Sequence, residues 1–300
     1  LSMAYGSVHA AAAQTLFGAL DRAGLRAIAG PVLMDTECPP ALVVPPDTAL
    51  GAVETLAERW HGHDDGRLRV AVIPRFALSC TPEMMRGAGR LAERLDLRVT
   101  THLAETLKEC EIARERFGTA DYLQVYEDFG LLRPGAVFAH CVHVTEASWD
   151  RFAAAGAVVA HCPDSNDFLG SGGMPLAPVL DRDITLTIGT DVAAGRTFSI
   201  PRILSSAFDN ARRQDVDLPL SQLLWWATRG GALALGEPRV GLLEVGLEAD
   251  MTLLAVPEWA DDLDTVLGRV LFDHDAPPVR RTWVRGRLVW SDAAPSPRAG

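Results

Sequence analysis

Short apolar runs alternate with longer stretches of helical periodicity, and this alternation constrains the fold more than any other feature. Seven runs have the length and composition of buried strands: 2–8, 26–34, 67–74, 97–103, 135–140, 156–161 and 184–190. Between them, as in PEMMRGAGRLAERL (82–95), apolar residues recur at three- and four-residue spacing. Alternating strands and helices predict a parallel sheet with right-handed crossovers.

Two α/β folds are built in this way, a (β/α)8 TIM-type barrel and an open doubly wound sheet. The open sheet is disfavoured because no Gly-x-Gly-x-x-Gly follows a first strand. A barrel needs eight strands and carries its chemistry at their carboxyl ends. Because only seven runs are present and the sequence opens within one of them, we expect a barrel whose first strand is absent from this sequence.

The pattern changes after residue 236, where short alternating strands and glycine turns replace the longer units. GLLEVGLEADMTLLAV (241–256) and PVRRTWVRGRLVWSD (278–292) are the two clearest runs. We therefore expect a barrel over residues 1–236 and a small C-terminal β-sandwich element over 237–300.

Composition narrows the range of partners. The net charge of −11 argues against nucleic acid or an anionic membrane surface, and no apolar run reaches the length of about 18 residues that a membrane span needs. The five cysteines never form Cys-x-x-Cys, which favours a reducing cytoplasm over a disulfide framework or structural zinc. The opening LSMAYGSVHAAAAQ lacks a basic region, so we expect no signal peptide.

Polar side chains end several of the expected strands. His102, His140 and Asp191 each follow an apolar run directly, and Glu105 lies three residues beyond the first of them. One such histidine alone is as easily a hydrogen-bonded core residue. Three donors at corresponding strand ends instead predict a site for Zn²⁺ or Fe²⁺, because these ions bind imidazole and carboxylate.

The motifs at these positions resemble a known family. THLAE, AHCVH, AHCPDSN and IGTDVAAG together resemble the amidohydrolase superfamily, in its branch of metal-dependent deaminases and chlorohydrolases. GPVLMD, PRFALSC and FLGSGG resemble the guanine deaminase family within that branch. The likeness runs in the same order over nearly all 300 residues, which makes it far more specific than any one motif.

The resemblance implies the chemical roles of four residues. His102 would bind the metal and lie against the substrate, and His140 would bind the metal or hold the reactive water. Asp191 would bind the metal and take a proton from that water. Glu105 would contact the substrate and carry a proton to a ring nitrogen and then to the leaving amine.

Four further residues would meet the substrate. Arg75 would donate hydrogen bonds to the carbonyl edge of a purine, and Phe76 would pack on its ring. His161 and Asn166, in AHCPDSN, would lie at the mouth of the barrel as supporting or substrate-side groups.

The implied reaction is the hydrolytic deamination of guanine to xanthine and ammonia by a metal-activated water, with zinc, or alternatively Fe²⁺, as the cofactor and a homodimer as the assembly. Another aminopurine, a triazine or a related heterocycle is the alternative substrate. A catalytically inactive, truncated barrel kept as a binding subunit is the alternative outside enzymes. Chemistry on a phosphate ligand is disfavoured because TDVAAG places a carboxylate where an anion would be repelled.

The family pattern also includes a His-x-His pair at the end of the first barrel strand, and no such pair is found in a suitable place. The one His-x-His, His61 and His63, follows the helical AVETLAERW, so we expect it on a surface loop. We therefore expect the sequence to be part of a longer chain. The alternative is a short, open barrel with weak or no activity.

Overall fold

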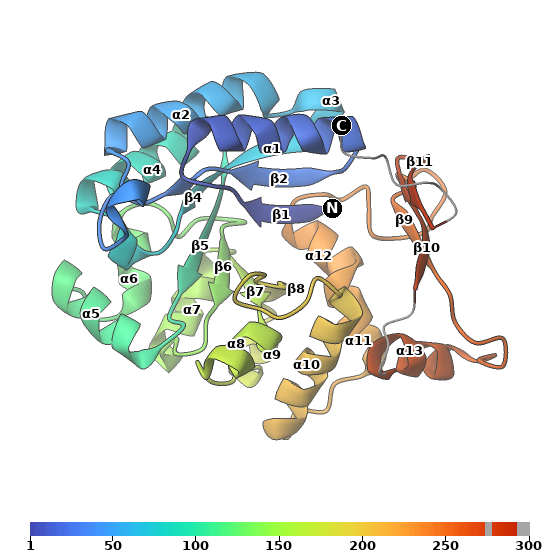
Figure 1. Ribbon diagram of the computed structural model, residues 1–300. Coiled ribbons are helices and arrows are strands. Elements are labelled where there is room, and N and C mark those ends of the chain that lie inside the picture. The colour runs from blue at the N-terminus through green and yellow to red at the C-terminus, as the bar shows by residue number, and fades with distance from the viewer. Residues whose placement is uncertain (274–277, 293–300) are drawn as a thin grey trace.

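The fold is that of a computed structural model that describes residues 1–273 and 278–292. A curled parallel sheet forms its centre (Figure 1). The strands pair in the order β1 (Ser2–Tyr5), β2 (Ala27–Gly30), β4 (Leu68–Pro74), β5 (Arg98–Leu103), β6 (Val137–His140), β7 (Val158–His161) and β8 (Thr185–Ile188), and the short β3 (Val32–Leu33) also pairs with β4. All seven expected barrel strands are present. Within the described residues no pairing joins β8 to β1, so the sheet is a partly closed barrel.

Helices surround the outer face of this sheet (Figure 1). The longer ones are α1 (Ala10–Ala23), α2 (Pro46–Trp60), α4 (Pro82–Arg94), α5 (Leu107–Phe117), α6 (Tyr122–Asp128), α7 (Glu146–Ala154), α8 (Pro163–Leu169), α10 (Ile200–Arg213) and α11 (Leu220–Ala227). Shorter turns of helix are α3 (His63–Gly66), α9 (Ala177–Asp181), α12 (Arg229–Ala234), η1 (Pro40–Leu42) and η2 (Ala77–Ser79). Among the described residues, no helix combines the length and apolar character that a membrane span requires.

The helix ends follow from local sequence. At α5, Thr106 and Glu109 form a reciprocal capping box, so two otherwise unpaired backbone N–H groups are satisfied. At the other end of α1, Gly24 takes a left-handed conformation with φ of 68°, which a residue without a Cβ adopts at little cost. Both caps fix where the chain turns back toward the sheet.

The central strand β4 is buried on both faces. In β4, Val70 and Val72 belong to the cluster packed against the helices, whereas Ala71 and Ile73 belong to a second cluster on the inner face. This second cluster also includes Ala234 of α12. Apolar residues at successive positions, rather than strict alternation with polar ones, are what a parallel sheet covered on both sides requires.

The C-terminal part forms a separate antiparallel sheet beside the barrel (Figure 1). Its strands β9 (Met251–Leu254), β10 (Val279–Val284) and β11 (Arg287–Ser291) pair in the order β11-β10-β9, and α13 (Leu263–Phe272) lies between β9 and β10 in the chain. The boundary at residue 236 and the sandwich over 237–300 stay predictions, and residues 274–277 and 293–300 lie outside the described residues.

Arg26 joins the C-terminal part to the barrel through a buried ion-pair network. Its side chain is 2% exposed and lies just before β2. It pairs with Asp250 at 2.8 Å and Glu237 at 3.4 Å, and it also pairs with Glu248. The carboxylates come from positions more than 200 residues away in the chain, so the network ties the two ends of the fold together.

Arg26→Ala is expected to destabilise the protein by about 3 kcal/mol, the lower end for breaking a buried ion pair, because Glu237 keeps its pair with Arg69 and Glu248 keeps its pair with Arg285. Urea unfolding measures the change in the free energy of unfolding. Arg94→Ala is the matched control, since the ion pair of Arg94 with Glu54 is exposed, and its unfolding midpoint should stay close to that of the parent. Equal effects of the two substitutions would contradict a structural role for the Arg26 network.

Candidate active site

Three strand ends bring His102, His140 and Asp191 together. His102 lies near the end of β5, His140 ends β6, and Asp191 follows β8. One nitrogen from each histidine and one oxygen of the carboxylate lie within 4.8 Å of one another. His102 and His140 are 38 positions apart in the chain, and His140 and Asp191 are 51 apart. They meet because parallel strands end at the same rim of the sheet.

The backbone at this rim is strained. His140, Cys141 and Asp191 take φ values of 71°, 53° and 49°, in the left-handed region that residues with a Cβ rarely adopt. Cys141 N–H also returns to the carbonyl of Ala139 at 3.0 Å, which makes a γ-turn centred on His140. Such residues cost about 1–3 kcal/mol each and persist where the surrounding fold imposes them, as at active sites.

Hydrogen bonds through Nδ1 orient both histidine rings. His102 Nδ1 donates to the carbonyl oxygen of Arg75 at 2.6 Å, and His140 Nδ1 donates to Oδ1 of Asn166 at 2.8 Å. In a neutral imidazole whose Nδ1 donates a hydrogen bond, Nε2 carries the lone pair. Burial lowers the pKa of His102 to about 3, so its imidazole is neutral, which is the form that binds a metal.

The space around His140 Nε2 fits a divalent cation. This nitrogen is buried and has no hydrogen-bond partner among the described residues. Glu105 Oε2 lies 3.8 Å from it and Asp191 Oδ2 lies 3.9 Å from it, too far for hydrogen bonds. A buried polar atom without a partner marks a place for water or an ion, and imidazole with carboxylate is a donor set that suits zinc or iron.

Two serines support the carboxylates, and sequence reasoning did not identify them. Ser165 Oγ donates to Asp191 Oδ2, and Ser171 Oγ donates to Glu105 Oε1 at 3.1 Å. The available signal was their position: Ser165 directly precedes Asn166 in AHCPDSN, and Ser171 lies in the glycine-rich FLGSGG.

Arg75 and Phe76 lie on the loop after β4, and that loop is firmly held. The Arg75 guanidinium lies 4.9 Å from the centre of the Phe76 ring. Arg75 is exposed, and within the described part of the chain its guanidinium makes no hydrogen bond or ion pair. The loop is anchored by Tyr126, whose hydroxyl accepts from Ala77 N–H at 3.1 Å. A fixed loop thus presents a cation stacked over an aromatic ring.

His161 and Asn166 are both deeply buried. His161 is 0% exposed, and neither ring nitrogen has a partner among residues 1–273 and 278–292. Burial lowers its pKa to about 3. Asn166 is occupied by its hydrogen bond to His140, although its Nδ2 group has no partner in the same range. Substrate contact by these two residues stays a prediction.

The His-x-His pair lies away from the cluster. His61 and His63 are both exposed, as expected of a surface loop. His61 Nδ1 accepts from Val70 N–H at 3.2 Å near the start of β4, and His63 pairs with Asp21 at 3.1 Å. Neither reaches the carboxyl ends of the strands, where His102 and His140 lie.

Comparisons with known proteins find relatives that cover nearly the whole chain. Residues 3–289 match the amidohydrolase family, whose members are metal-dependent. The chain is 34% identical to guanine deaminase of Escherichia coli (strain K12), over 96% of this chain and 68% of that protein. The solved structure of E. coli guanine deaminase aligns with a TM-score of 0.92 at 35% identity, covering 96% of this chain and 69% of that one.

Two further relatives bear on the substrate. Guanine deaminase from C. acetobutylicum, solved with guanine in its active site, aligns with a TM-score of 0.90 at 28% identity, over 96% of this chain and 71% of that one. The 5-methylthioadenosine/S-adenosylhomocysteine deaminase of Nitratidesulfovibrio vulgaris (strain Hildenborough) is 37% identical over 91% of this chain and 62% of that protein. Both relatives are named for purine compounds.

Proposed function

The chain belongs to the amidohydrolase family, and from that premise we propose that it hydrolyses guanine to xanthine and ammonia. The observation that carries the proposal is the combination at one rim of the sheet: a cluster of His102, His140 and Asp191, with Glu105 beside it. The likeness to two guanine deaminases supports guanine as the substrate.

Zinc is the proposed metal, with His102, His140 and Asp191 as ligands from this chain. Two imidazoles and one carboxylate are also the donor set of non-haem Fe²⁺ sites, so iron is the alternative. A divalent cation bound here would polarise water and make it nucleophilic near neutral pH.

Arg75 and Phe76 are proposed to select the purine. A guanidinium has five N–H donors and no acceptor, so Arg75 can donate to the carbonyl oxygen and ring nitrogen of guanine. Phe76 offers an aromatic face for the planar ring. Adenine has an amino group in place of the carbonyl, so Arg75 would lose its carbonyl acceptor and meet a donor there instead.

Glu105 is proposed to move the protons of the reaction. Oxygen from water bonds to C2 of guanine, and the C2–N bond to the exocyclic amine breaks. Glu105 carries one proton of the water to the ring nitrogen as the tetrahedral centre forms, and then carries the proton of the new C2 hydroxyl to the amine, which leaves as ammonia while C2 becomes a carbonyl carbon. Its Oε2 atom, 3.8 Å from His140 Nε2, lies at the cluster where those protons must pass.

Turnover of a panel of substrates tests the proposed function. Zinc-loaded protein should release ammonia from guanine at least about 100-fold faster than from adenine or 5′-methylthioadenosine, because both lack the carbonyl group that Arg75 would bind. The 37% identity to a 5-methylthioadenosine/S-adenosylhomocysteine deaminase makes that nucleoside the strongest alternative substrate. If 5′-methylthioadenosine is turned over faster than guanine, it takes the place of guanine as the proposed substrate. If no substrate is turned over, the inactive barrel is favoured.

Arg75→Met is expected to raise KM for guanine about 10- to 100-fold with a smaller change in kcat, because it removes hydrogen bonds from a charged donor. Steady-state kinetics measure both constants. Arg86→Met is the matched control. Arg86 lies on α4, its guanidinium is 5.6 Å from the centre of the Phe129 ring, and it contacts none of the site residues. If Arg75→Met leaves KM unchanged, Arg75 does not bind guanine.

A homodimer and a cytoplasmic location are proposed together with the activity. The location is supported by five cysteines that form no disulfide. Light scattering during gel filtration measures the mass in solution, and a mass of one chain would exclude the dimer. Fluorescence imaging of the tagged protein in cells tests the location.

A further inference from the structure

We propose that Ser171 is a positioning residue, which holds the Glu105 carboxylate in the orientation that proton transfer requires. The inference rests on the proposed function, because it assigns Ser171 a role through Glu105. Ser171 Oγ donates to Glu105 Oε1 at 3.1 Å. Among the described residues this is the one hydrogen bond that the Glu105 carboxylate receives.

The bond distinguishes two carboxylate oxygens that are otherwise equivalent. A free glutamate rotates about its last torsion with little preference, because that torsion is broad and nearly two-fold. With Oε1 held by Ser171, Oε2 is directed to the cluster, where it lies 3.8 Å from His140 Nε2. The Glu105 side chain is 21% exposed, so packing alone leaves it room to turn away.

Ser171 is itself fixed from both sides of its backbone. It is 8% exposed, and its N–H donates to the carbonyl of Asn166 at 2.9 Å. Its carbonyl oxygen accepts from His143 Nε2 at 2.9 Å. His143 in turn donates its backbone N–H to the carbonyl of Ala104, the residue before Glu105, at 2.9 Å. The serine and the glutamate are thus held by one hydrogen-bonded frame, which consists of Asn166, Ser171, His143 and Ala104.

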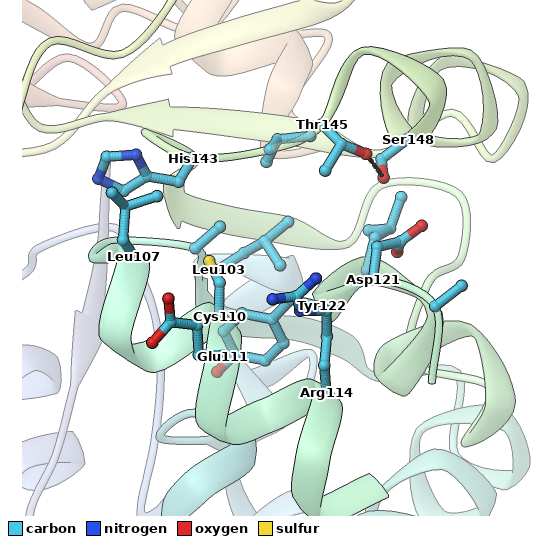
Figure 2. A pocket seen from close by; sticks show the side chains of 14 residues that line it. Leu103, Leu107, Cys110, Glu111, Arg114, Asp121, Tyr122, His143, Thr145 and Ser148 are labelled. Atoms are coloured by element: carbon cyan, nitrogen blue, oxygen red, sulfur yellow. Dashed lines mark hydrogen bonds between the residues drawn. The ribbon is translucent and has the colours of Figure 1, made fainter. Parts of the chain in front are cut away.

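His143 lies where this frame meets a pocket between α5 and the loop after β6 (Figure 2). Next to Ser171, Gly172 has φ of 112°, which a residue with a Cβ rarely adopts, and a Cβ there would make a tight contact of 3.2 Å with Val142 Cγ1. The left-handed glycine thus restricts the path of the backbone beside Ser171. The hydroxyl is therefore held in place before substrate binds.

The test compares Ser171→Ala and Ser171→Thr in the zinc-loaded protein. Ser171→Ala should lower kcat about 10- to 100-fold, the effect of losing one hydrogen bond to a charged group, with KM changed less than about twofold. Zinc content should stay the same, because Ser171 contacts none of the three proposed ligands. Ser171→Thr keeps a hydroxyl and should restore most of kcat.

One measurement and one control variant separate positioning from folding. The solvent deuterium isotope effect on kcat should rise in Ser171→Ala, because proton transfer by a misdirected Glu105 becomes slower than the other steps. Ser148→Ala is the control for loss of a buried hydroxyl, since Ser148 is 1% exposed and pairs with Thr145. It should change neither kcat nor the isotope effect.

The outcomes distinguish the two proposals. If the parent protein turns over guanine and Ser171→Ala keeps kcat within about twofold, the positioning role is wrong while the proposed function stands. If Ser171→Ala loses kcat but the isotope effect is unchanged and Ser171→Thr restores nothing, Ser171 acts on folding and the positioning role is again wrong. If the parent turns over no guanine, the proposed function fails first.

Discussion

Asp191→Asn is expected to weaken zinc binding by more than about 100-fold and to lower guanine turnover by at least as much, since even residues that only orient a ligand contribute about 10- to 100-fold to metal affinity. Asp191 supplies the negative charge among the three proposed ligands. Asparagine keeps the shape and can still accept from Ser165, so the substitution removes charge with little change in packing. The loss should therefore be in metal binding rather than in folding.

Two experiments measure the effect of Asp191→Asn on metal binding. The first is the amount of zinc per chain after dialysis against a weak chelator, and the second is a competition titration that gives the zinc affinity. Asp167→Asn is the matched control, because Asp167 lies on the neighbouring α8 and pairs with the exposed Arg213. It should keep zinc and activity. If Asp191→Asn holds one zinc per chain with the affinity of the parent, Asp191 is not a ligand, whatever happens to turnover.

The sequence predicted the strands and the cluster for one physical reason. In a parallel sheet each strand's carboxyl end comes to the same rim, so a polar residue directly after an apolar run is placed there by topology alone. His102, His140 and Asp191 could be named on that basis, and the structure brings them together. His61 could be set aside on the same basis, because it follows a helix rather than a strand.

The contacts that orient these side chains could not be predicted in this way. His102 is oriented by the carbonyl of Arg75, and a backbone oxygen has no sequence signal. Ser171 reaches Glu105 across 66 residues through a loop whose path depends on tertiary packing. Arg26 likewise finds its partners only once the C-terminal part lies against the barrel. Periodicity reports which face of an element is buried, but not which distant group meets it.

Glu105→Gln is expected to lower guanine turnover about 10²- to 10⁴-fold while zinc content stays near that of the parent, because the amide cannot carry the proton that general acid–base catalysis needs. Glutamine has the same shape as glutamate, and its amide oxygen can still accept from Ser171 Oγ. Kinetics and metal analysis on the same preparation measure the two effects. Glu111→Gln, an exposed residue on α5, is the control and should change neither.

Metal content and activity, measured together, distinguish the two largest predicted effects. Asp191→Asn should lose metal and activity together, whereas Glu105→Gln should lose activity and keep the metal. If Glu105→Gln instead loses zinc, Glu105 is a ligand: its Oε2 atom, 3.8 Å from His140 Nε2, is as close to that nitrogen as Asp191 Oδ2 at 3.9 Å. If it keeps both zinc and turnover within about tenfold, the proton must travel by another group, since loss of a general acid–base typically costs more. Only the split between metal and turnover assigns the two carboxylates their separate roles.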